Sequence, residues 1–392
     1  MTSNWIKCEL QEVADLTVGY VGTMADEYVD EGVPFLRSLN IEPYFINSND
    51  MKYISENFSL KLKKSQLQKG DVVIVRTGKP GTCAVVPEAL DGANCSDLVI
   101  VRPYKNIINP FFLSAYINVM ANNQIYSNLV GAVQQHFNVT SAKKLVLTIP
   151  SINEQNKIAQ FLKNINKKIF LNDKAASELK KVVVSLFESY FYKPRYNANE
   201  EKSENVFDNI TEIKEKNVEQ KNYPVLSVVK EGEFKASEDV FTKQVYSKST
   251  KNYKIVRRNQ VAYNPARANI GSIAMLKEYD IGLVSPIYTV FELKDTITPT
   301  FFYYYMKQPI FQEMIKHHAI GTTRQNFPFE AFKMFPMVVP PMELQLKFEE
   351  IAKPIEQKIA KLKEENKVLA DIRDTLLPKL MSGELPVEVG EK

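Results

Sequence analysis

The 392-residue chain has few of the residues that build covalent or metal cross-links. It contains only three cysteines, Cys8, Cys83 and Cys95, and three histidines. No two cysteines have the CxxC spacing, so we expect neither a disulfide framework nor a metal site. We therefore expect a chain that folds by burying apolar side chains and works without a cofactor.

Long hydrophobic runs are also missing. No window approaches the roughly 18 apolar residues that a membrane-spanning helix needs, and Lys7 and Glu9 interrupt the start of the chain, where a signal peptide would lie. The hydrophobic fraction of 44% and the charged fraction of 24% are ordinary for a globular protein. We expect a cytoplasmic protein with no membrane partner, and a length of 392 residues indicates two or more domains.

The most informative feature of the sequence is an internal duplication. A segment that begins at Gly131 ends at Pro150, and a similar segment that begins at Gly321 ends at Pro340. The two offsets are equal, since 321 − 131 and 340 − 150 both give 190. The register continues beyond the prolines, where Gln155 matches Gln345. Matching apolar pairs follow, such as Ile165 with Ile355. The repeat predicts two related modules, each followed by a helix.

Each module has the pattern of a mixed α and β domain. Short β-rich runs are bounded by Gly, Pro and Asn, and one amphipathic or aromatic helix follows a proline in each module. The expected strands cover 72–75, 84–86, 98–101 and 145–149 in the first module, and 261–263, 272–275, 287–291 and 337–339 in the second; the helices cover 111–120 and about 301–306.

Two heptad stripes follow the modules. Apolar residues recur with 4-3-4-3 spacing from Ile158 to Tyr190 and again from Phe348 to Leu380. Each stripe carries one asparagine, Asn172 or Asn366, whose buried amide would fix the register at some cost in stability. The stripes could each pack on their own domain. Five heptad steps exceed one domain face, however, which favours an antiparallel intramolecular coiled coil.

The sequence therefore predicts an α+β chain of two pseudo-repeated domains separated by two long antiparallel helices. Residues 197–221 are charged and poor in apolar residues, which indicates an exposed linker. The expected boundaries are a first domain at 1–150, a first spacer helix at 151–195, a charged linker at 196–222, a second domain at 223–341, a second spacer helix at 342–383 and a tail at 384–392.

Several ordered motifs resemble those of the specificity (S) subunits of type I restriction-modification systems. They lie at residues 67–74 followed by 76–78, at 150–155, at 263–267 with Gly271, at 282–288 and at 375–384. The resemblance covers essentially the whole chain. It implies two target recognition domains that bind double-stranded DNA, and docking of two modification (methyltransferase) subunits and of restriction (endonuclease/translocase) subunits. The sequence departs from the repeat at one acidic residue. The position equivalent to Glu154 is 344, but the glutamate of the second half is Glu343, so no role is transferred to that carboxylate.

Polar loops in both domains are candidates for reading DNA bases. Arginine pairs best with guanine and asparagine or glutamine with adenine in the major groove. The candidate DNA-binding residues are Arg76, Thr77, Lys79, Gln134 and Gln135 in the first domain, and Asn264, Arg267, Asn269, Thr323, Arg324, Gln325 and Asn326 in the second. Lys143, Lys144 and Lys333 are candidates for phosphate contacts. Each string could equally be a solvated polar turn.

Enzymatic motifs are incomplete. Asn264-Pro265-Ala266-Arg267 resembles the tetrapeptide of adenine methyltransferases but lacks its aromatic residue. Thr77-Gly78-Lys79-Pro80 resembles a phosphate-binding loop but lacks the Gly-Lys-Ser/Thr order. We therefore expect a non-catalytic recognition subunit with no catalytic residues and no bound metal. The strongest alternative is a two-headed protein-interaction adaptor that does not bind nucleic acid.

Overall fold

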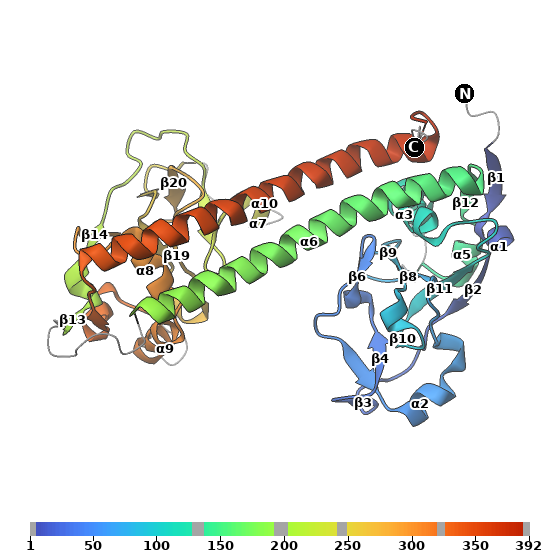
Figure 1. The fold of residues 1–392 in the computed structure, drawn as a ribbon, viewed down its shortest axis with the longest axis horizontal. Helices are drawn as coiled ribbons and strands as arrows, with labels where there is room; N and C mark the ends of the chain where they lie inside the picture. The colour runs from blue at the N-terminus through green and yellow to red at the C-terminus, as the bar shows by residue number, and fades with distance from the viewer. Residues whose placement is uncertain (1–4, 128–136, 192–202, 241–248, 320–325, 387–392) are drawn as a thin grey trace. The chain divides into compact units, whose positions relative to one another are not determined.

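The computed structural model of the chain describes residues 5–127, 137–191, 203–240, 249–319 and 326–386. The chain divides into two compact units. The first unit comprises Met1–Asp173 and Lys363–Lys392, and the second comprises Lys174–Leu362. Two long helices, α6 (Ile152–Phe191) and α10 (Met342–Ser382), each contribute one part to each unit (Figure 1).

The centre of the first unit is a four-stranded antiparallel sheet with the order β2-β11-β8-β9. Its strands are β2 (Ala14–Val18), β11 (Leu98–Pro103), β8 (Val72–Val75) and β9 (Cys83–Val85). All four residues of β8 are buried, with Val72 and Ile74 in one hydrophobic cluster and Val73 and Val75 in another. Successive side chains of a strand point to opposite faces, so this continuous apolar run shows that the sheet is covered on both sides.

Smaller elements cover this sheet. Helix α3 (Pro110–Met120) packs in the same cluster as Val72 and Ile74. A second sheet has the order β10-β4-β7-β3, formed by β10 (Asn94–Cys95), β4 (Val33–Leu36), β7 (Lys52–Ile54) and β3 (Tyr28–Val29). The described part of the unit also contains two antiparallel strand pairs and four short α-helices. They are β1 (Ile6–Glu9) with β12 (Val146–Ile149), the hairpin β5 (Ile41–Glu42) and β6 (Phe45–Ile46), α1 (Leu10–Val13), α2 (Glu56–Lys61), α4 (Asn122–Ser127) and α5 (Val139–Lys143).

The second unit repeats this plan. Its central sheet has the order β14-β21-β18-β19, with β14 (Ile210–Ile213), β21 (Thr289–Leu293), β18 (Val261–Tyr263) and β19 (Ile273–Met275). The pair β13 (Ser203–Asn205) and β22 (Pro336–Val338) corresponds to β1 and β12. The remaining elements are α8 (Pro299–Met306), α9 (Pro309–His318), α7 (Ser237–Val240), β15 (Leu226–Val228) with β16 (Phe234–Ala236), and β17 (Lys254–Arg257) with β20 (Ile281–Val284). The predicted duplication is confirmed at the level of strand order.

The heptad stripes of α6 and α10 pack antiparallel within each unit. In the second unit, Ala176 of α6 shares a buried cluster with Ile359 and Leu362 of α10. In the first unit, the amide of Asn172 donates to Oδ1 of Asn366 at 2.9 Å. The two seam asparagines therefore meet, and the predicted intramolecular coiled coil is confirmed.

The same helices also complete the two globular cores. Leu377, Leu380 and Met381 near the end of α10 are buried with Ile158 and Leu162 in the core of the first unit. Val183 and Phe187 of α6 are buried with Phe348 of α10 in the core of the second unit. Each helical stripe thus contacts both its partner helix and a globular core, so the two packing alternatives left open by the sequence occur together.

The structure corrects the expected linker at 196–222. Within this range, β13 pairs with β22 and β14 pairs with β21, so residues 203–213 belong to the second globular core. Val206 and Ile210 are buried there. The sequence predicted a linker here because the strands are short and flanked by charged residues, and because their pairing partners lie far along the chain. Within the described ranges, no helix is long and apolar enough to cross a membrane.

Candidate nucleic-acid interface

In the first unit, one predicted DNA-reading loop is joined by a backbone hydrogen bond to the residue that follows the other. Strand β8 ends at Val75, and the loop to β9 begins with Arg76. The amide of Phe137, the first described residue after the loop that contains Gln134, donates to the carbonyl of Arg76 at 3.1 Å. The turn between β8 and β9 uses Gly78 with a φ of 82°, a conformation that favours glycine. The loop after β8 is therefore joined to the segment that begins at Phe137, at one end of the central sheet.

The side chain of Arg76 is held inside this arrangement. Its guanidinium forms an ion pair with Asp97, and its Nε donates to the carbonyl of Phe137 at 3.1 Å. Only 16% of the Arg76 side chain is exposed. This geometry favours a role in which Arg76 positions the loop, whereas Lys79 is exposed and Thr77 is half-buried. Asp97 was not identified from the sequence, because it lies 21 residues from Arg76 in an unremarkable string.

The second unit contains the equivalent hydrogen bond. Strand β18 ends at Tyr263, and the loop that follows presents the carbonyl of Pro265 to the amide of Phe327 at 3.0 Å. Phe327 and Phe137 occupy the same place in the repeat, since 327 − 137 gives 190. The loop after the central strand is thus joined in both units to the segment that follows the second predicted loop.

Asn264 shapes the turn in the second unit. Its Oδ1 accepts a hydrogen bond from the amide of Ala266 at 3.0 Å, and its carbonyl accepts from the amide of Arg267 at 2.9 Å. Only 9% of Asn264 is exposed. Asparagine commonly caps tight turns by bonding its own backbone two residues on. The local contacts of Asn264 therefore account for its presence without a base contact.

The turn presents other polar side chains more openly. Arg267 and Asn326 are exposed, and Asn269 is half-buried. The turn closes at Gly271, whose φ is 96°, and a Cβ placed there would lie 2.3 Å from the carbonyl oxygen of Lys230. Gly271 is therefore required by both backbone conformation and space. Arg267 is the arginine that this turn presents to solvent.

Five candidates fall outside the described residues: Gln134, Gln135, Thr323, Arg324 and Gln325. Two candidate phosphate contacts, Lys143 and Lys333, are exposed and occupy equivalent repeat positions, since 333 − 143 gives 190. Lys144 is also exposed. The Nζ of Lys333 lies 4.7 Å from the centre of the Phe207 ring. Both units thus place a lysine shortly after the phenylalanine that anchors the loop pair.

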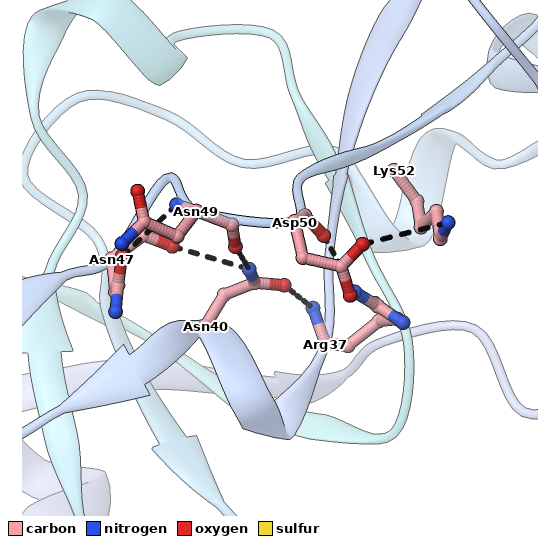
Figure 2. A network of polar contacts seen from close by, with 6 residues as sticks. All are labelled: Arg37, Asn40, Asn47, Asn49, Asp50 and Lys52. Carbon is pink, nitrogen blue, oxygen red and sulfur yellow. Dashed lines mark hydrogen bonds and ion pairs between the residues drawn. The ribbon is translucent and has the colours of Figure 1, made fainter. Parts of the chain in front are cut away.

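A polar network that the sequence did not predict braces another part of the first unit (Figure 2). The guanidinium of Arg37 donates to the backbone carbonyl of Asp50 at 2.6 Å and to its carboxylate at 2.8 Å. Buried Asn40 donates to the carbonyls of Asn47 at 3.1 Å and Asn49 at 3.3 Å. The hydrogen bond from Arg37, followed by the charge of Lys52, holds the pKa of the exposed Asp50 carboxyl below its usual value. The network ties together the two ends of the segment that carries the β5–β6 hairpin.

Parts of the chain, and the chain as a whole, are similar to known proteins. Residues 2–181 match the family model described as the type I restriction modification DNA specificity domain. The chain is 25% identical over 134 residues to the EcoBI specificity subunit of Escherichia coli, covering 34% of this chain and 28% of that protein. It is 21% identical over 420 residues to the MjaIX specificity subunit of Methanocaldococcus jannaschii, covering 98% of this chain and 94% of that protein. The family match covers residues 2–181, and over nearly its whole length the chain is similar to a type I restriction-modification specificity subunit.

Solved structures share the fold of this chain. The S subunit of a type I restriction-modification system from M. genitalium aligns over 98% of this chain and 97% of its own, with a TM-score of 0.58 and 16% identity. A chain from a study of assembly and conformational transition of the type I restriction-modification system aligns with a TM-score of 0.50, 15% identity, and 97% and 98% coverage of the two chains. The likeness in fold extends over both units of the chain, including the second unit, most of which lies beyond the matched domain.

Proposed function

We propose that this specificity subunit recognises a two-part, asymmetric DNA site, with one half read by each unit. The observation that carries this proposal is the pair of equivalent hydrogen bonds from Phe137 to Arg76 and from Phe327 to Pro265. In each unit this hydrogen bond joins the loop after the central strand to the segment that follows the second polar loop. One scaffold with two different sets of loop residues suits the reading of two different half-sites.

The exposed side chains supply the chemistry of recognition in this proposal. Arg267 can form two parallel hydrogen bonds to the major-groove edge of guanine, and Asn326 can pair with adenine. Lys79, Lys143 and Lys333 can bind phosphates, which gives affinity without sequence information. Arg76 and Asn264 shape the loops from within. The residues of the loops outside the described ranges, including Gln134 and Arg324, remain candidates for base contacts.

The long helices supply a surface for partner subunits. Within the first unit, Phe170 and Leu171 of α6 are 66% and 48% exposed. Val368 and Ile372 of α10 are 48% and 40% exposed and lie four residues apart, on one face of the helix. Large exposed apolar side chains on a helix pair are typical of protein-binding surfaces. We propose that two methyltransferase subunits dock on the helices and that restriction subunits join them. In this assembly, which we place in the cytoplasm, the specificity subunit is non-catalytic.

The division of labour is tested with Arg267→Ala in the complex with the methyltransferase subunits. The methylated motif is mapped on genomic DNA. We expect one or more bases of one half-site to become degenerate while the other half-site is unchanged, because a bidentate arginine contact discriminates by about 1–3 kcal/mol. Arg258→Ala is the matched control, since Arg258 is an exposed arginine of the same unit that pairs with Asp280.

Two results would contradict the proposal. Equal loss of specificity in both halves would overturn the assignment of one half-site to each unit. Absence of DNA binding by the complex at low salt would overturn DNA recognition and favour the protein-interaction adaptor. Binding to random duplexes at low and raised salt separates these cases, because binding dominated by phosphate contacts weakens steeply with salt.

A further inference from the structure

The β5–β6 hairpin of the first unit contacts the helix pair through Tyr44. This residue lies between the two strands of the hairpin and has a φ of 75°. Its amide donates to the carbonyl of Cys83 in β9 at 3.1 Å, which fixes the hairpin tip on the central sheet. The side chain is half-buried, and burial raises the pKa of Tyr44 to about 12. A non-glycine residue in this backbone conformation requires support from its surroundings.

The Tyr44 ring is supported by a contact with Arg373 of α10. The guanidinium carbon lies 5.0 Å from the centre of the ring. The same guanidinium donates to Oδ1 of Asn166 in α6 at 3.2 Å and to the carboxylate of Asp374 at 2.8 Å. Arg373 occupies a heptad seam position, where an apolar residue is the rule. Its contacts with Tyr44 and Asn166 explain the exception, because they link the hairpin to both helices.

The second unit has a comparable contact with different chemistry. The Nζ of Lys277, just after β19, lies 2.8 Å from each carboxylate oxygen of Glu356 in α10. The same Nζ lies 3.9 Å from the centre of the Tyr303 ring in α8. The Lys277 and Glu356 side chains are only 27% and 24% exposed. This ion pair therefore ties the central sheet and α8 to the long helix.

The two contacts occupy equivalent helix positions. Asn166 and Glu356 are separated by the repeat offset, since 356 − 166 gives 190. Each accepts a hydrogen bond from a cation that also lies over a tyrosine ring. In the first unit the cation comes from the opposite helix, and in the second it comes from the globular part. The two units therefore have the same kind of contact, a cation between a tyrosine ring and the long helices, built from different residues. This repetition indicates a function beyond the packing of either helix alone.

We propose that Tyr44–Arg373–Asn166 and Tyr303–Lys277–Glu356 are joints that fix the orientation of each globular part on its stretch of the helix pair. They are positioning residues for recognition, because the angle at which each part is held decides where its loops meet the DNA. The proposal rests on the two-part site proposed above. Its specific consequence is that the joints set the tolerance for the number of base pairs between the half-sites. The network of Arg37, Asn40 and Asp50 stiffens the hairpin that carries Tyr44 (Figure 2).

The first joint is tested with Tyr44→Ala, Tyr44→Phe and Phe45→Ala in the purified complex with the methyltransferase subunits. Binding is measured on duplexes that carry both half-sites at the native spacing, and with one base pair added or removed. The native complex is expected to prefer one spacing. For Tyr44→Ala we expect that preference to fall by roughly tenfold, the range of a partly buried cation–aromatic contact. The base preferences within each half-site are expected to stay the same.

The controls separate the joint from general destabilisation. Tyr44→Phe keeps the ring and is expected to keep the preference. Phe45→Ala removes a neighbouring hairpin side chain that is 57% exposed, and is also expected to keep it. The second joint is tested by charge exchange: Lys277→Glu and Glu356→Lys should each relax the preference. The double variant re-forms the ion pair but not the contact of a cation with the Tyr303 ring, so it should restore the preference in part. This restoration would not occur if either single change acted only through misfolding.

The outcomes distinguish the two proposals. If the native complex prefers one spacing, and Tyr44→Ala and Lys277→Glu retain that preference, the joints are overturned while the two-part site stands. If Phe45→Ala relaxes the preference as much as Tyr44→Ala, the ring contact is also overturned. If the native complex binds every duplex equally, the two-part site itself fails, and the inference fails with it.

Discussion

Gln155 and Gln345 make the same three hydrogen bonds, one set in each unit. Gln155 accepts from the amide of Asn109 at 2.9 Å and donates to the carbonyls of Ile107 and Pro150 at 3.0 and 2.9 Å. Gln345 accepts from the amide of Thr298 at 2.8 Å and donates to the carbonyls of Thr296 and Pro340 at 3.1 and 2.8 Å. Both side chains are fully buried. Each glutamine joins the start of a long helix to the residue that caps α3 or α8.

Replacing either glutamine by leucine should destabilise its own unit. Gln345→Leu removes three hydrogen bonds, and the Thr298 amide and the carbonyl of buried Pro340 lose this partner. We expect a loss of about 2–4 kcal/mol, because each unsatisfied buried polar group costs about 1–3 kcal/mol. Hydrogen exchange of the Thr298 amide and of the second central sheet reports the local effect. Gln160→Leu, an exposed position on α6, should change stability by less than about 0.5 kcal/mol. Equal effects at the buried and exposed positions would contradict this role.

The contact between Asn172 and Asn366 predicts different results for single and double substitutions. Asn172→Leu leaves the buried part of Asn366 facing an apolar partner and should destabilise the helix pair by about 1–3 kcal/mol. The double change to leucine should recover most of this loss, because no amide is then left unsatisfied. It should also weaken the register, which the amide pair specifies.

Thermal unfolding measures the stability of these variants. Disulfide trapping between cysteines placed on α6 and α10 reports whether one register or several are populated. A double variant as unstable as the single variant, or one that retains a single register, would argue against the role given to the asparagine pair.

Gly271 and Gly78 both have a positive φ, at 96° and 82°. Alanine at Gly78 meets nothing within 4 Å, so Gly78→Ala should cost only backbone strain, roughly 1–2 kcal/mol. Alanine at Gly271 would place a Cβ 2.3 Å from the Lys230 carbonyl, so the turn must also shift. Urea unfolding should therefore show a larger loss for Gly271→Ala. The same loss at both positions would show that the carbonyl moves freely.

Arg76 and Asp97 should act as a unit. Arg76→Ala and Asp97→Ala each break the ion pair beside the Phe137 carbonyl, and both should loosen the loop after β8. Because the carboxylate is 35% exposed, we expect a coupling energy of only about 1 kcal/mol. A double-mutant cycle based on hydrogen exchange of the Phe137 amide measures it. Additive effects would show that the two side chains act independently. Specificity should degrade in the first half-site and stay intact in the second.

The sequence by itself determined the repeat, the helix pair and three of the four strands of each central sheet. These features depend on periodicity and on spacing along the chain, which are visible without knowledge of distant contacts. Heptad spacing alone places both Asn172 and Asn366 in the seam between the helices. The structure confirms this prediction, because the two side chains form a hydrogen bond. Gln155 and Gln345 are separated by the repeat offset of 190 residues, which predicts that they occupy equivalent positions. The offset did not predict their hydrogen bonds.

Tertiary structure decided which polar residues are free to meet a partner. Arg76 is held by Asp97 and by the Phe137 carbonyl, 61 residues away, and Asn264 is enclosed by its own turn. The seam position of Arg373 became intelligible only when the hairpin placed Tyr44 beside it. Local patterns cannot reveal such pairings, because they depend on contacts between residues far apart in the chain. Burial and hydrogen bonding therefore separated the side chains that build the loops from those that the loops present.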